Sequence, residues 1–355
     1  MSPTLDLRPD LAGAAPYVSP QRPARYRMNT NESPYPPPPE VLEAVRAELG
    51  RLELNRYPDK DASALLDALS AYTGHERAGL WVANGSNEVF LHLLLAFSGP
   101  GRRVLVFEPT YSMHAMIARI CGAEVIALPR AEGFTVDLTA AAEVIAQRAP
   151  EVVILCSPNN PTGNREPRAT IEVLLEGAPG LVVVDEAYGE FSPEAPSAVS
   201  LLPAHPNLVV VKTLSKAWRL AGARIGYALG DPGQIGLLEV VRLPYHLSAL
   251  TQALGAAALA HCGDVERRAA DIAAERDRIS VGLQELGVRA FPSEANFVLF
   301  EVDDPAAVWE ALLVRGVLVR SYAGVPGVER CLRVTAGLPE ETDAFLAAME
   351  EVLDA

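Results

Sequence analysis

Four short apolar runs recur through the middle of the chain and constrain its fold more than any other feature. Each is too short for a buried helix, and each is separated from the next by enough residues for a crossover helix. Continuous apolar character, rich in β-branched residues, is typical of parallel strands that helices cover on both faces. The sequence therefore predicts an α/β fold with a large, mostly parallel sheet that includes residues 104–107, 152–155, 181–184 and 208–211.

The segments that precede this sheet predict an extended arm followed by a helix. Residues 1–40 are rich in proline, which fixes φ and lacks a backbone N–H, so neither a helix nor a central strand fits there. Helical periodicity then begins near Glu40, and Gly50 supplies a stop signal.

The segments that follow the sheet predict a smaller α+β domain. After Gly263 a long charged helix extends to about Leu286. A strand at 296–301, a helix at 305–315 and a strand at 317–320 come next. We therefore predict an N-terminal arm (1–40), a large domain (41–260) and a small C-terminal domain (261–355).

The composition argues against several classes of function. The 355 residues carry a formal net charge of −15, so the surface repels nucleic-acid backbones and anionic lipid heads. Every apolar stretch is far shorter than the ~20 residues that span a bilayer, and residues 1–20 do not resemble a secretory signal. The four cysteines and six histidines show no metal-ligand spacing. We expect a cytoplasmic protein that binds no metal, nucleic acid or membrane.

Polar side chains follow three of the predicted strands at the point where each strand ends. The segments are Ser157–Gly163 (SPNNPTG), Asp185–Tyr188 (DEAY) and Thr213–Lys216 (TLSK). In an open α/β sheet, ligands bind outside the carboxyl ends of the parallel strands. We therefore expect these three segments to face one crevice.

The residue types in that crevice suit an aldehyde cofactor. A desolvated lysine loses its proton more readily and can form an imine with an aldehyde, which suggests Lys216. Pyridoxal phosphate also needs an anion for its ring nitrogen and donors for its phenolic oxygen, which Asp185 and then Tyr188 with Asn160 supply. Arg224 offers a cation for the phosphate.

A glycine turn before a predicted helix completes the phosphate site. Residues Asn84-Gly85-Ser86-Asn87 precede a helix that we expect to begin near Glu88. Free N–H groups at the start of a helix bind anions. Ser215 and Thr213 add hydroxyl groups to the same site.

Taken together in this order and spacing, these motifs identify a family. The chain resembles, over nearly its whole length, the fold-type I pyridoxal-phosphate aminotransferases. The resemblance implies that Lys216 is the imine-forming lysine and proton shuttle, and that Tyr111 stacks on the pyridine ring. It implies that Tyr57 reaches the cofactor phosphate of a neighbouring subunit, so that the enzyme is a homodimer. Arg333 matches the arginine that binds the substrate carboxylate.

Other segments resemble the histidinol-phosphate aminotransferases within that family. These segments are Ala15–Tyr17, Asn29–Pro34, Leu243–Ser248 and Glu294–Phe297. The resemblance implies transamination between histidinol phosphate and 2-oxoglutarate in histidine biosynthesis, with Tyr17, Asn31, Arg320 and Arg333 as substrate contacts. The chain departs from the usual pattern at Thr30, Asn87 and His246, and the last departure leaves the substrate pocket less defined.

Several alternative interpretations stay open at this point. Arg320 also fits a solvated strand end, and Tyr17 also fits an arm residue packed on the fold. Within the same fold, the rival functions are an aromatic or broad-specificity aminotransferase and a threonine-phosphate decarboxylase. A non-catalytic ligand-binding module is disfavoured by the intact set of Lys216, Asp185 and Arg224, and a Rossmann-type oxidoreductase lacks a G-x-G-x-x-G turn after a strand.

Overall fold

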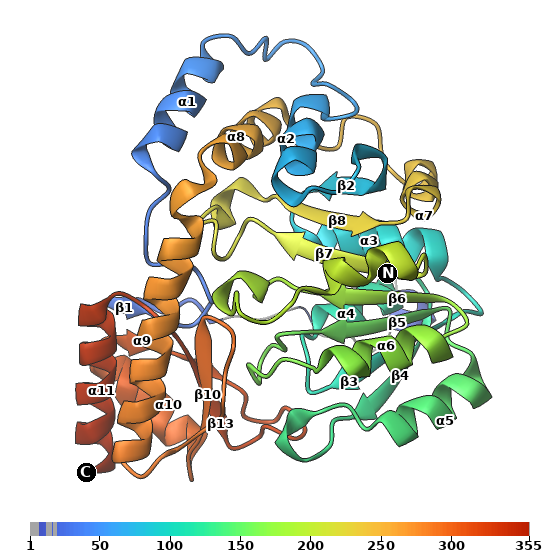
Figure 1. The fold of residues 1–355 in the computed structure, drawn as a ribbon. Coiled ribbons are helices and arrows are strands. Elements are labelled where there is room, and N and C mark those ends of the chain that lie inside the picture. Colours follow the sequence, from blue (N-terminus) through green and yellow to red (C-terminus); the bar gives the residue numbers. More distant parts are fainter. Residues whose placement is uncertain (1–6, 12–15, 17–19, 355) are drawn as a thin grey trace, which may run out of the picture.

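The centre of the molecule is a twisted seven-stranded sheet (Figure 1). The computed structural model describes residues 7–11, 16 and 20–354. The strand order is β2-β8-β7-β6-β5-β3-β4, and β8 runs antiparallel to both of its neighbours while the other strands are parallel to one another. The strands are β2 (Leu80–Ala83), β3 (Arg103–Glu108), β4 (Glu124–Pro129), β5 (Val152–Cys156), β6 (Leu181–Asp185), β7 (Leu208–Thr213) and β8 (Gly226–Gly230).

Successive residues of the central strands point into two separate hydrophobic cores. In β5, Val153 and Leu155 enter one core, whereas Val152 and Ile154 enter the other. This burial on both faces explains why the strands read as continuous apolar runs, and it confirms the predicted α/β class. The first core packs against α2 (Ser63–Thr73), α5 (Leu138–Arg148), α6 (Arg168–Gly177) and α8 (Ala249–Ala260), and the second packs against α3 (Ser86–Phe97), α4 (Met113–Ile120) and α7 (Pro232–Gly236).

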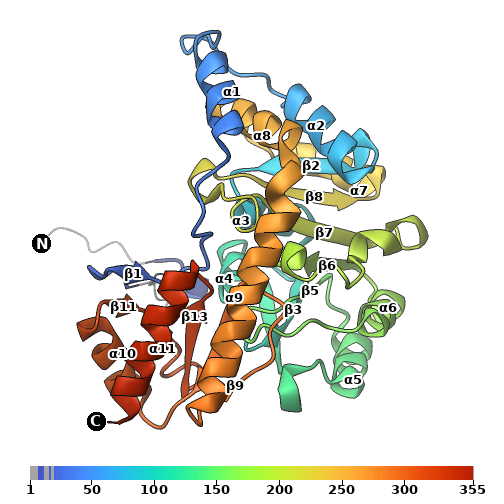
Figure 2. The same cartoon turned by 60° about the vertical axis from the view of Figure 1, so that its left-hand side comes forward.

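A smaller antiparallel sheet lies beside the large one. Figure 2 shows the long helix α9 (Val265–Glu285) extending from the large sheet to this second sheet, with α11 (Pro339–Leu353) packed along it. The small sheet has the order β12-β13-β10-β9, and α10 (Pro305–Val314) covers its edge. Its strands are β9 (Arg289–Ala290), β10 (Phe297–Glu301), β12 (Arg320–Ser321) and β13 (Cys331–Thr335).

The predicted strand at 317–320 is divided into two short strands that belong to different sheets. β11 (Val317–Leu318) pairs in parallel with β1 (Tyr26–Arg27) of the arm, whereas β12 pairs with β13. Long-range pairing causes this split, and an apolar run alone does not reveal it.

The N-terminal arm is extended, as predicted, but it is also part of the packed structure. Met28 is 1% exposed within the first core, and its backbone N–H donates to the carbonyl of Leu318. Helix α1 (Pro39–Leu49) follows and ends before Gly50. The boundaries that we drew at residues 40 and 260 stay a prediction.

The register of the large sheet aligns the ends of β5, β6 and β7, from which the three polar segments continue. Cys156 at the end of β5 pairs with Asp185 at the end of β6, and Asp185 pairs with Val211 on β7. The three polar segments therefore leave the sheet side by side. Within the described part of the chain, no helix has the length and hydropathy needed to span a bilayer.

Candidate active site

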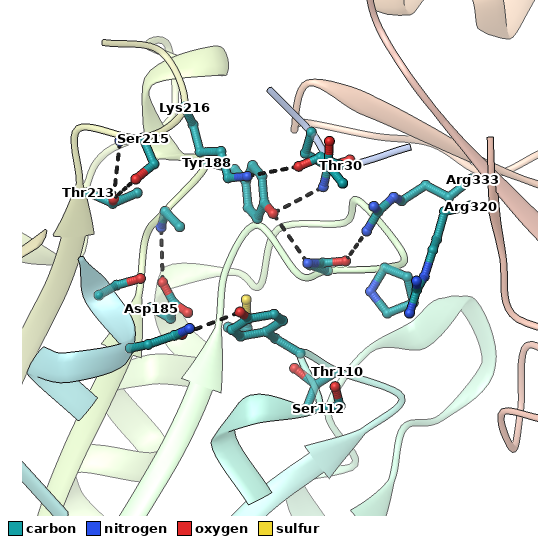
Figure 3. A pocket seen from close by; sticks show the side chains of 18 of the residues that line it. Thr30, Thr110, Ser112, Asp185, Tyr188, Thr213, Ser215, Lys216, Arg320 and Arg333 are labelled. Atoms are coloured by element: carbon teal, nitrogen blue, oxygen red, sulfur yellow. Dashed lines mark hydrogen bonds between the residues drawn. The ribbon is translucent and has the colours of Figure 1, made fainter. Parts of the chain in front are cut away.

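A cavity of about 280 Å³ lies at the carboxyl ends of β5, β6 and β7, between the two sheets (Figure 3). Four of its side chains are cationic, although the protein as a whole is strongly acidic. Predicted site residues that line it are Asn31, Ser86, Asn87, Tyr111, Asn160, Asp185, Tyr188, Thr213, Ser215, Lys216, Arg224, Arg320 and Arg333.

Lys216 follows β7 and extends its amine into this cavity (Figure 3). Its Nζ donates to the carbonyl oxygen of Thr30 at 3.1 Å. Burial, followed by the positive charge of Arg333, lowers the pKa of Lys216 to about 8. The neutral, nucleophilic amine is therefore far more populated near neutral pH than for an ordinary lysine.

Asp185 ends β6 at the floor of the cavity and is 3% exposed. Its Oδ2 lies 2.9 Å from Nε2 of His114, and its Oδ1 accepts from the backbone N–H of Ala187 at 3.1 Å. These partners hold the carboxylate in place, so that it can face a cationic ring nitrogen of a bound ligand.

Tyr188 is buried with its hydroxyl group at the centre of an amide cluster. Asn31 Nδ2 and Asn160 Nδ2 both donate to the phenolic oxygen, at 3.0 and 3.2 Å. Burial raises the pKa of Tyr188, so the hydroxyl keeps its proton. Tyr188 and Asn160 therefore form a polar wall next to Lys216, whose Nζ lies 5.7 Å from the centre of the tyrosine ring.

Gly85 and Arg224, for which the sequence predicts a role in binding a phosphate, lie in contact with each other. Gly85 has a φ of +83°, and a Cβ atom there would lie only 2.5 Å from Nη2 of Arg224. Helix α3 begins immediately afterwards at Ser86, two residues earlier than expected, with free N–H groups in its first turn. Ser215 and Thr213 lie near this end of the cavity, with their hydroxyl groups 3.0 Å apart.

Arg320 and Arg333 lie at the opposite end of the cavity from Thr213 and Ser215 (Figure 3). They occupy directly paired positions on β12 and β13. Arg333 is 5% exposed and donates through Nη1 to Asn160 Oδ1 and through Nη2 to the carbonyl of Asn29, at 2.5 and 2.9 Å. The cavity therefore has cationic side chains at two separate ends, and Lys216 and Tyr188 line the part between them.

Among the described residues, the predicted site residues Gly85 and Tyr57 are not part of the cavity lining. Tyr57 is 80% exposed and stacks on Tyr245 with ring centroids 4.5 Å apart. Tyr17 lies outside the described residues. The ring of Tyr111 does line the cavity, and its hydroxyl donates to Asn87 Oδ1 at 3.3 Å.

Sequence reasoning missed several residues that build the site. His114 lies in the first turn of α4, and its ring packs edge-on against that of Tyr111, with ring centroids 5.4 Å apart. Tyr322 contacts Arg333, and no local motif indicated it. Thr30, Thr110 and Ser112 also line the cavity. Within the described ranges, no cluster of histidine, cysteine and carboxylate side chains is placed to hold a metal.

Gly85 with Arg224, the lysine and the carboxylate together fit one cofactor. The absence of a side chain at Gly85 lets Arg224 lie against the start of α3, where the two could hold a phosphate. Lys216 supplies the amine, and Asp185 supplies the anion for a pyridinium nitrogen. The donor set is that of pyridoxal phosphate.

Comparison with known proteins agrees with this geometry. The family model described as aminotransferase class I and II matches residues 26–349. A histidinol-phosphate aminotransferase of Corynebacterium efficiens is 47% identical over 98% of this chain and 95% of the relative, and that of Thermobifida fusca is 47% identical over 97% and 95%. The crystal structure of the Sinorhizobium meliloti histidinol-phosphate aminotransferase in complex with pyridoxal 5'-phosphate superimposes with a TM-score of 0.90 at 28% identity, covering 99% of both chains.

The fold and the site thus define a pyridoxal-phosphate-dependent enzyme, and the chain belongs to the class I and II aminotransferases. Within that family, it belongs with the histidinol-phosphate aminotransferases.

Proposed function

We propose that the enzyme transfers an amino group between histidinol phosphate and 2-oxoglutarate, which in the biosynthetic direction makes histidinol phosphate from imidazole-acetol phosphate and glutamate. The observation that supports this most strongly is the second cationic end of the cavity. Arg320 and Arg333 lie opposite each other there, apart from Arg224, which serves the cofactor phosphate. Two guanidinium groups match a phosphate dianion better than one, because a single cation leaves half of its charge unpaired.

Some residues of the cavity bind the substrate, and others transfer a proton or stabilise charge. Arg320 and Arg333 hold the anionic end of the substrate, so that its α-carbon lies near Nζ of Lys216. Pyridoxal phosphate, when bound, withdraws electrons from the bond that breaks at that carbon. Lys216 takes the proton from the α-carbon, Asp185 with His114 holds negative charge at the ring nitrogen, and Tyr188 with Asn160 donates to the phenolic oxygen.

Rates with a panel of amines test this function. The purified holoenzyme is assayed with 2-oxoglutarate and either histidinol phosphate, phenylalanine or O-phosphothreonine, and both glutamate formation and CO₂ release are measured. We expect the highest kcat/KM for histidinol phosphate and no CO₂ from O-phosphothreonine. A higher kcat/KM for phenylalanine would make the enzyme an aromatic aminotransferase, and CO₂ release would make it a decarboxylase.

We also propose that the enzyme is a homodimer in which Tyr57 serves the neighbouring active site. Tyr57 lies outside the cavity of its own chain and stacks on Tyr245. Apolar side chains near these two tyrosines in the sequence are each more than 70% exposed, namely Leu54, Val240 and Leu243. Covering such apolar side chains is favourable when a second copy packs against them. The cytoplasmic location stays a prediction from the sequence.

Subunit mixing tests the shared site. Lys216→Ala and Tyr57→Ala proteins are each expected to have little activity. When they are unfolded and refolded together, one site of each mixed dimer contains both native residues, so about a quarter of all sites should recover. No recovery, with mixed dimers verified by differential tagging, would contradict the arrangement.

A further inference from the structure

Arg320 and Arg333 form a pair of like charges that the sheet forces together. They are directly opposite each other on the antiparallel strands β12 and β13, where side chains on the same face have Cβ atoms about 5 Å apart. Like charges in such positions repel each other. When no anionic substrate is bound to offset this repulsion, some neighbouring group must hold the two guanidinium groups in place.

Tyr322 contacts both of these arginines. It follows β12 two residues after Arg320, on the same side of the chain, and it lines the same cavity. The centre of its ring is 5.9 Å from Cζ of Arg320 and 5.6 Å from Cζ of Arg333. Both distances fall within the range in which the negative face of an aromatic ring attracts a cation.

The hydroxyl group of Tyr322 adds a directional contact to this attraction. Its oxygen accepts a hydrogen bond from Nη1 of Arg333 at 2.7 Å, and the hydroxyl donates to Oδ1 of Asn160 at 3.4 Å. The same Nη1 also donates to Asn160. Tyr322 therefore ties the substrate-binding arginine to the amide that sits beside Tyr188.

We infer that Tyr322 is a positioning residue that sets the affinity of the cavity for anionic substrates by acting through Arg333 and Arg320. Its hydroxyl orients Arg333, which every anionic substrate uses. Its ring keeps Arg320 next to Arg333, so that an anion with three terminal oxygens can contact both. The part that concerns the phosphate rests on the proposed function, because only a phosphorylated substrate needs both arginines at once.

Two substitutions separate the hydroxyl from the ring. Tyr322→Phe removes the hydroxyl, and Tyr322→Leu removes both. For Tyr322→Phe we expect KM to rise about tenfold for histidinol phosphate and for glutamate, with kcat changed less than about twofold, because the lost contact is made equally in the ground and transition states. For Tyr322→Leu we expect KM to rise further than in Tyr322→Phe, and this further rise should be larger for histidinol phosphate than for glutamate.

A double-mutant cycle distinguishes positioning from general support of the fold. If Tyr322 acts through Arg333, then Tyr322→Phe should have no further effect on KM in a protein that already carries Arg333→Lys. Tyr72→Phe is the matched control, because Tyr72 packs on Trp218 and is not part of the cavity lining. Thermal melting of each holoenzyme shows whether a variant has lost stability instead.

The outcomes are distinct. Additive effects in the cycle, or a KM within twofold of the wild type for Tyr322→Phe, would overturn the inference. Failure of the wild-type enzyme to convert histidinol phosphate would overturn the proposed function and the phosphate part of the inference. In that case the cycle with glutamate, or with whichever amino donor converts fastest, still decides whether Tyr322 positions Arg333.

Discussion

Two lysines only four residues apart are expected to behave in opposite ways. The chain holds three lysines, and Lys212 and Lys216 both lie on or just after β7. Burial and Arg333 lower the pKa of Lys216 from its ordinary value of 10.5 to about 8. Burial alone would also lower the pKa of Lys212, but Glu190 and Glu186, each 3.2 Å away, outweigh it and hold that pKa well above its usual range.

The size of the effect on Lys216 follows from its pKa. At pH 7 a pKa of about 8 leaves roughly a tenth of the amine neutral, about 300-fold more than a pKa of 10.5 would. The cofactor-free protein is exposed to trace acetic anhydride between pH 6 and 11, and modified peptides are counted by mass spectrometry, with exposed Lys60 as the internal reference for reagent. Lys216 should show a half-maximal rate near pH 8, whereas Lys212 should stay almost unmodified.

Substitutions of charged residues around Lys216 test the direction in which each neighbouring charge shifts its pKa. Arg333→Met removes a cation and should move the half-maximal pH of Lys216 upward, while Glu32→Gln removes an anion and should move it downward. Circular dichroism checks that each cofactor-free variant is folded. The reasoning is refuted if Lys216 titrates near 10.5, if Lys212 titrates together with it, or if the two substitutions shift Lys216 in the same direction.

Three further substitutions test other parts of the site. Asp185→Asn should slow the single-turnover rate about a hundredfold with a smaller loss of cofactor affinity, whereas Asp303→Asn, at an exposed side chain, should leave the rate unchanged; equal rates in the two variants would exclude the proposed role. Gly85→Ala should weaken cofactor binding, measured by fluorescence titration, much more than Gly101→Ala, because both have positive φ but only the former meets a side chain. Lys212→Met leaves the buried carboxylate of Glu186 and the partly buried carboxylate of Glu190 uncompensated and should lower the free energy of unfolding in urea by about 3–5 kcal/mol; a change below 1 kcal/mol would show that the ion pair adds little.

The parts of the molecule that the sequence predicted are those with strong local signals. Four β-branched runs indicated β3, β5, β6 and β7 because burial on both faces requires continuous apolar residues. Their carboxyl ends meet at one edge of the sheet, so the sequence alone predicts that Asp185 and Lys216 face one crevice, and both line the cavity.

Long-range contacts determine the parts that sequence patterns did not predict. The pairing of β8 with β2 and the pairing of β1 with β11 each join segments more than 100 residues apart. His114 belongs to the site through its contact with Asp185, and Tyr322 through its contacts with Arg333, Arg320 and Asn160. Such contacts follow from the packing of the whole chain.

The most direct test of the account is the single-turnover reaction of the holoenzyme with histidinol phosphate, compared with phenylalanine. Loss of the visible absorbance band of the bound cofactor is followed by stopped flow, in the wild type and in Arg320→Gln. The account predicts a preference for histidinol phosphate of about a hundredfold or more, from charge-assisted contacts to two arginines, and a large reduction of that preference in Arg320→Gln. An equal or faster reaction with phenylalanine, or an unchanged preference in the variant, would contradict the claim that the paired arginines select a phosphorylated amine.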